Sequence, residues 1–120
     1  MPGPSNQPFF PEIAGGSADM TGAANGDKLQ GVQGAECIKV STGLMQVTLL
    51  PPNAGLGSTE VFVSHNPGFG TSKGGGGMST TMSSNSAGIF NITLWDQTTV
   101  PPVEIDGDVH FTIKRKYPDR

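Results

Sequence analysis

The sequence predicts an all-β protein: a small β-sandwich, jelly-roll-like, with an extended N-terminal arm. From residue 36 onward, apolar and polar residues alternate with the period of two that is typical of half-buried strands. Glycine (18 of 120 residues) and proline (10) separate these runs, as they do in sandwiches of short strands. No stretch shows the periodicity of a long helix. We therefore expect an arm over residues 1–35 and a β-sandwich domain over residues 36–120.

The first 35 residues show neither periodicity and are rich in Gly, Pro, Ala, Ser and Asn. A segment of this composition buries too little apolar surface to offset the entropy lost on ordering. We therefore expect it to extend away from the domain and to bind a partner. Its separated apolar side chains are interpreted as plugs for pockets of that partner: Phe9, Phe10, Ile13, Met20 and Leu29.

The first two predicted strands of the domain are Glu36–Ser41 and Leu44–Leu50. In the second, apolar residues alternate with Gln46 and Thr48. The pair Pro51-Pro52 ends it, because proline has no N–H to donate to a sheet.

The third predicted strand is Thr59–His65, and a stretch rich in glycine, serine and threonine follows over residues 70–88. A phosphate-binding loop needs a glycine four residues ahead of Gly-Lys-Ser/Thr, at the start of a helix. Here Lys73 precedes the glycine run and no helix is expected after it. We interpret the stretch as a connection within one domain, with a turn at Gly74–Gly77 and a weak polar edge strand at Met78–Met82.

The last two strand regions are Gly88–Trp95 and Val103–Tyr117. In the second, the odd-numbered positions are mostly apolar and the even-numbered ones mostly polar. The sequence Asp106-Gly107-Asp108 interrupts this run and can bend it into two strands.

The polar positions Glu104, Asp106, Asp108 and His110 form the best candidate for a metal site. Oxygen ligands at alternate strand positions suit Ca²⁺, but the spacing is not that of an EF-hand. An exposed strand face beside a turn explains the same residues, so we expect no metal and no cofactor.

Catalysis has little support in the sequence. The histidines are His65 and His110, and no Gly-x-Ser-x-Gly motif is present. A Ser-His-Asp set converges only in space, so a small hydrolase using His110 with Asp108 remains a third possibility. The flanks of Cys37 read as strand, which indicates a small buried residue rather than a nucleophile. We expect the protein not to be an enzyme.

Three further residues are possible interface or ligand contacts: Trp95, Met78 and Met82. Trp95 stands beside polar residues at a strand end, where its ring could stack on a sugar, although a core or interface role explains a lone tryptophan as well.

The charge pattern and termini exclude several classes of partner. The net charge is −3, and the basic residues near the end, Lys114, Arg115, Lys116 and Arg120, read as a solvated strand end rather than a nucleic-acid site. The first residues lack the features of a signal peptide, and no apolar run is long enough to span a membrane. We expect neither nucleic acid nor membrane as a partner.

Four runs of the domain, within residues 38–117, resemble the strands of small bacteriophage virion modules: KVSTGLMQVTLLPP, STEVFVSHNPG, GIFNITLW and DVHFTIKRK. The strand order resembles that of phage capsid decoration proteins and fibre modules. This resemblance implies a homotrimer that binds the major capsid protein on the capsid exterior of a virion assembled in the host cytoplasm. It also implies that the arm of residues 1–35, with its apolar plugs, is the part that contacts the capsid, but it carries over no site residues of the family.

Together these observations predict a capsid decoration, or cement, protein of a tailed phage that stabilises the head as a trimer. The alternative is a short fibre or host-surface module that binds a glycan. At 120 residues the chain has no room for a long fibre shaft, which favours the decoration role.

Overall fold

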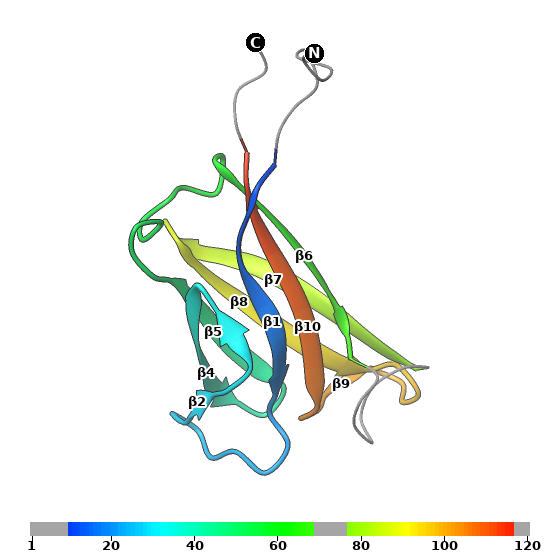
Figure 1. Cartoon of the computed structure of the whole chain (residues 1–120). Coiled ribbons are helices and arrows are strands. Elements are labelled where there is room, and N and C mark those ends of the chain that lie inside the picture. Colours follow the sequence, from blue (N-terminus) through cyan, green and yellow to red (C-terminus); the bar gives the residue numbers. More distant parts are fainter. Residues whose placement is uncertain (1–9, 69–76, 117–120) are drawn as a thin grey trace.

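The protein is a small all-β sandwich, which confirms the predicted fold class (Figure 1). The computed structural model describes residues 10–68 and 77–116. The strands are β1 (Glu12–Asp19), β2 (Lys28–Leu29), β3 (Val32–Gln33), β4 (Ala35–Ser41), β5 (Leu44–Leu49), β6 (Val61–Pro67), β7 (Met78–Ser86), β8 (Ile89–Asp96), β9 (Val103–Glu104) and β10 (Asp108–Arg115). No helix in the described part of the chain is long and apolar enough to cross a membrane.

The strands form two sheets, and neighbouring strands are antiparallel throughout. The first sheet has the order β3-β1-β10-β6, and the second has the order β2-β4-β5-β8-β7, with β9 also paired to β8. The strands β1 and β10, from opposite ends of the described chain, are neighbours in the middle of the first sheet (Figure 1). Ser17 lies opposite His110 in that ladder.

Strand alternation places one apolar face of each sheet in a shared core. In β5 and β8, and in β10 from Val109 to Ile113, every second residue is buried and the residues between them face outward. The largest fully buried side chains are Phe90, Met20, Met45, Leu49, Ile92, Leu94, Ile113, Val47, Val109 and Cys37.

The break predicted in the last run separates the two sheets. The chain pairs with β8 as β9 in the second sheet, and then continues as β10 in the first sheet. The residues between the two strands, Ile105–Gly107, carry the chain across. The alternating apolar residues before and after this crossover therefore belong to two different sheets and not to one continuous face.

The predicted arm is wrong for most of its length. Residues 12–35 supply β1, β2, β3 and the start of β4, so position 35 is not a domain boundary. Met20 is fully buried and Leu29 is 8% exposed, both in the core of this chain, and Ile13 packs against that core. These three side chains are therefore not free to act as plugs for a capsid. Phe10 is exposed, and Phe9 lies outside the described residues.

The small residues of β1 explain why composition alone failed to predict this strand. Ala14 and Ala18 fill narrow spaces in the core, and Gly16 lies where β3 approaches closely. A Cβ atom on Gly16 would lie 2.0 Å from the carbonyl oxygen of Gly31. The segment has little apolar surface of its own, but it is buried by neighbours from distant parts of the sequence.

Candidate binding surfaces

Trp95 lies on the outer face of the second sheet. It pairs with Ser79 of β7 on one side and with Glu104 of β9 on the other. Residues that are directly opposite in antiparallel strands share a face, so these three side chains form one row. The ring nitrogen Nε1 donates a hydrogen bond to Oγ1 of Thr81 at 2.8 Å. Gln97 Nε2 donates to Ser79 Oγ at 2.7 Å beside it.

Met78 and Met82 do not join Trp95 in one patch. Met82 lies opposite Ile92, which is fully buried in the core, and Met78 lies opposite Asp96. Both methionines therefore face the inner side of the second sheet, whereas Trp95 faces the outer side. The exposure of β7 rises along its length, and Met82 is already 36% exposed.

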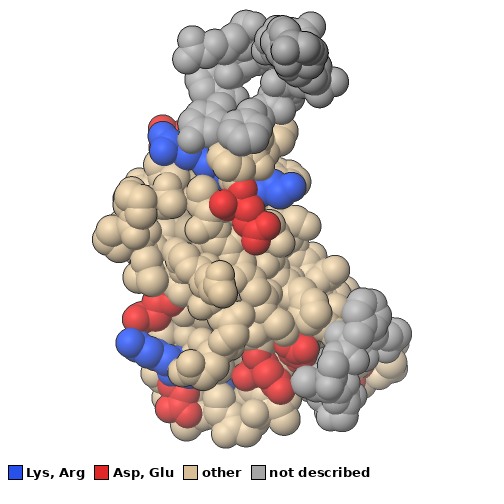
Figure 2. Space-filling model, in the orientation of Figure 1, with Lys and Arg blue, Asp and Glu red and all other residues tan. Residues whose placement is uncertain are grey.

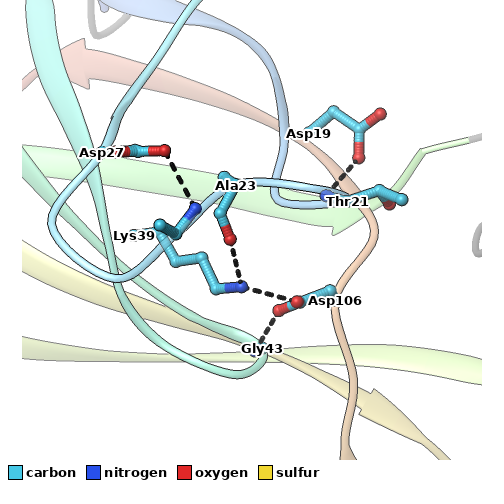
Figure 3. A network of polar contacts seen from close by, with 8 residues as sticks. Asp19, Thr21, Ala23, Asp27, Lys39, Gly43 and Asp106 are labelled. Carbon is cyan, nitrogen blue, oxygen red and sulfur yellow. Dashed lines mark hydrogen bonds and ion pairs between the residues drawn. The ribbon is translucent and has the colours of Figure 1, made fainter.

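A buried ion pair joins three segments at one end of the sandwich (Figure 3). The Nζ atom of Lys39 lies 2.6 Å from Oδ2 of Asp106 and donates to the carbonyl oxygen of Ala23 at 2.8 Å. The second carboxylate oxygen of Asp106 accepts a hydrogen bond from Gly43 N at 2.8 Å. The pair thus ties the loop after β1, the β4–β5 turn and the crossover before β10.

This network removes Asp106 from the metal site that the sequence suggested. Asp108 is also engaged, because its Oδ1 accepts a hydrogen bond from Ser17 Oγ at 2.7 Å. The chain changes sheets between Glu104 and Asp108, so the carboxylates do not gather on one face. Within residues 10–68 and 77–116, no group of three His, Cys, Asp or Glu side chains could hold a metal ion.

Ser17, Asp108 and His110 lie together, but not in the order that a hydrolase uses. His110 Nε2 lies 3.5 Å from Asp108 Oδ2, and Asp108 itself is only 5% exposed. In a Ser-His-Asp triad the imidazole stands between the hydroxyl and the carboxylate. Here the carboxylate stands between the hydroxyl and the imidazole. A polar groove on the same face is lined by Glu12, Gly16, Ser17, Ser64, Asn66, His110, Phe111 and Thr112.

His65 connects the two sheets. Its Nδ1 lies 2.7 Å from Oγ1 of Thr80 on β7. Burial lowers the pKa of His65 below its ordinary value of 6.5, because the charged imidazolium loses hydration there.

Cys37 is a buried residue, as its strand context predicted. Its thiol is 1% exposed, with Sγ 3.5 Å from Sδ of Met45. Burial raises the pKa of the Cys37 thiol to about 12, because a thiolate would be poorly solvated in the core.

The end of the sandwich where the described chain begins and stops carries exposed aromatic and basic residues. Lys114 of β10 lies opposite Glu12 of β1 and Phe62 of β6, so the three side chains form a row on the outer face of the first sheet. Phe62 is 56% exposed and Phe10 is 39% exposed. We call Phe10, Glu12, Phe62, Lys114 and Lys116 the terminal surface.

Backbone contacts bring the two ends of the described chain together at this surface. Arg115 N donates to the carbonyl oxygen of Pro11 at 3.0 Å, and Lys116 N donates to that of Glu60 at 2.8 Å. Figure 2 shows Lys and Arg atoms on both sides of this end, with acidic atoms between them. The sequence contained a signal for Phe62, because it is an apolar residue at an otherwise polar position of its strand.

Comparisons with family models, with curated proteins and with solved structures find no match to this chain.

Proposed function

We propose that the chain is a virion structural protein: a decoration, or cement, protein that binds and stabilises a phage head. The observation that supports this proposal is the terminal surface, where Phe10 and Phe62 are exposed, whereas the other described phenylalanines, Phe90 and Phe111, are buried. Exposed aromatic residues that cluster beside charged ones are typical of protein docking sites. In this role the protein sits on the capsid exterior, and its partners are the major capsid protein and, as a homotrimer, its own copies.

In this proposal the terminal surface contacts the capsid, whereas the sequence predicted that the whole of residues 1–35 would do so. Phe10 is the one described residue of the predicted capsid contacts whose side chain is largely exposed. Phe62 contributes to the same surface from β6. Lys114 of β10 lies between Phe62 and Glu12 of β1 in the row of side chains described above. A hydrophobic contact with a cationic rim would suit an acidic, apolar depression on a capsid subunit.

Binding to capsids tests this role directly. Undecorated heads, assembled from the major capsid protein encoded in the same genome, are sedimented with the wild type and with two variants, Phe10→Ala and Phe62→Ser. We expect both variants to bind more weakly. A matched control is Val100→Ser, because Val100 is 98% exposed in the loop between β8 and β9, away from the terminal surface.

Two outcomes would count against the proposal in different ways. If Phe62→Ser binds as well as the wild type while Val100→Ser does not, the contact surface is wrongly chosen. If the wild-type chain does not bind heads at all, the decoration role itself is rejected.

The second candidate function is a glycan-binding module of a fibre or host-contact structure. Trp95 favours it, because the indole is half-buried on an outer face, flanked by the hydroxyls of Ser79 and Thr81 and the carboxylate of Glu104. Sugars bind to such combinations of a ring and polar groups. A glycan array with the wild type, Trp95→Phe and Trp95→Ala tests it. Binding that is reduced in Trp95→Phe and lost in Trp95→Ala would support it, and an array without signals would reject it.

A further inference from the structure

We propose that the free edge of β7 pairs with β7 of a second copy of this chain, which joins two second sheets through an antiparallel contact. Among the described residues, the strand Met78–Ser86 is the last strand of the second sheet, with β8 on one side. An edge strand directs alternate N–H and C=O groups away from its sheet, where another strand can bind them. This inference does not depend on the capsid role.

The edge of β7 lacks most of the features that usually prevent such pairing, and its one irregularity lies near its end, between Ser84 and Ser86. Natural edges are protected by short length, charged side chains, proline or bulges. Among the edge strands of the described chain, β2 and β3 have two residues each, and β6 ends in Pro67. By contrast, β7 has nine residues, MSTTMSSNS, with no charge and no proline.

The backbone of β7 is regular over most of this length. Residues Met78–Ser84 pair one for one with Asp96–Phe90 of β8, and the register shifts only between Ser84 and Ser86. From Thr81 to Ser86 every residue is exposed. The regular and exposed portions overlap over Thr81–Ser84, which is where a second strand has the best access.

The composition of β7 fits a second copy of itself. An antiparallel contact about a two-fold axis sets each residue of the strand against a residue of the same strand. Like charges in such positions would repel, but β7 has none, and Ser and Thr side chains form favourable cross-strand pairs. Met82, which is 36% exposed beside the edge, would be covered by the partner strand.

The mass of the protein in solution is the first test. A two-fold contact gives an even number of chains of 12.4 kDa each: two if the contact acts alone, or six if it joins two of the homotrimers proposed above. We expect Met82→Lys to lower the mass at least two-fold, because it places a charged side chain on the edge of both strands, and charged side chains on edge strands oppose pairing. The control Thr59→Lys adds the same charge in the exposed loop before β6 and should keep the wild-type mass.

Cysteine cross-linking gives a second test that does not depend on Met82→Lys remaining folded. Single cysteines are placed in turn at Thr80, Thr81, Met82 and Ser83, and at Thr59 as the control. The native Cys37 is buried and should not take part. We expect at least one edge position to form a disulfide-linked dimer much faster than the control under mild oxidation.

The inference is overturned if the wild type has the mass of one chain or of three. It is also overturned if Met82→Lys, folded by circular dichroism, keeps the wild-type mass, or if no edge cysteine reacts faster than the control. None of these results bears on whether the terminal surface binds capsids.

Discussion

Lys39 Nζ lies 2.6 Å from Asp106 Oδ2, yet the two side chains differ in their access to water: that of Lys39 is 6% exposed and that of Asp106 is 28% exposed. The lysine depends on its partner for solvation, whereas the carboxylate retains some contact with solvent. Losing one partner should therefore have a different effect from losing the other.

We predict that Asp106→Ala lowers the free energy of unfolding by roughly 3–5 kcal/mol, because it leaves a buried ammonium group unpaired. Lys39→Met should cost less, since the remaining carboxylate can be hydrated. Urea titrations of the two single variants measure both values. The double variant should be more stable than Asp106→Ala alone. If the two single variants lost equal free energies of unfolding, this would contradict the argument that Lys39 depends on its partner for solvation more than Asp106 does.

The burial of Cys37 predicts that its thiol is unreactive in the native protein. The raised pKa, about 12, leaves almost no thiolate near neutral pH, and the side chain is 1% exposed. A colorimetric thiol reagent should label no cysteine in buffer and one per chain in denaturant. Rapid labelling of folded protein would show that the second sheet opens around β4.

The lowered pKa of His65 predicts a loss of stability in mild acid. The unfolded chain takes up a proton near the ordinary value of 6.5, whereas the folded chain takes it up only at lower pH. The contribution of His65 is therefore complete above pH 6.5 and declines as the pH falls from 6.5 toward the folded pKa.

Thermal unfolding midpoints on both sides of this range measure the effect. His65→Gln should reduce the decline in acid, and His110→Gln, which leaves His65 in place, should retain it. A decline of the same size in His65→Gln would assign the pH dependence to other groups.

Gly16→Ala should be strongly destabilising. A Cβ there would lie 2.0 Å from Gly31 O, and φ is +151°, so both the contact and the backbone resist a side chain. Backbone strain alone costs on the order of 1–3 kcal/mol. In Gly57→Ala the nearest atoms lie 3.9 Å from the new Cβ, so this control should change the unfolding midpoint little.

Deletion of residues 1–35 should unfold the protein rather than only detach it from a capsid. It removes β1 from the middle of the first sheet, and with it the buried side chains Ala18, Met20 and Leu29. Deletion of residues 1–9 leaves every described contact in place and should preserve the circular dichroism of the full chain. If a variant that lacks residues 1–35 still folds, this result would support the prediction that these residues form a separate arm.

The strands β4, β5 and β8 were predictable because their burial follows the period of two over most of their length. The predicted Leu44–Leu50 exceeds β5 by one residue, and the predicted Gly88–Trp95 differs from β8 by one residue at each end. In these strands the side chain that defines the pattern is also the one that is buried, so local sequence and tertiary structure agree.

The rest was not predictable, because tertiary contacts override the local pattern there. β1 contains two glycines and two alanines in eight residues, and its burial depends on β3 and β10. Lys39 lies on the inner face of β4, where its charge is offset by Asp106, a residue 67 positions away in the sequence. The candidate contacts Trp95 and Met82 lie on opposite faces of one sheet, which required the register of β7 to be known.

The pairing of β1 with β10 also affects the synthesis of the protein in the cell. Ser17 and Asp108, which hydrogen-bond across this pair, are 91 positions apart. On a translating ribosome, the middle of the first sheet must remain open until β10 has emerged from the exit tunnel. The apolar residues of β5 and β8 are synthesised earlier, and during that interval the incomplete first sheet buries them only in part. We therefore expect folding to be completed only once β10 has left the exit tunnel.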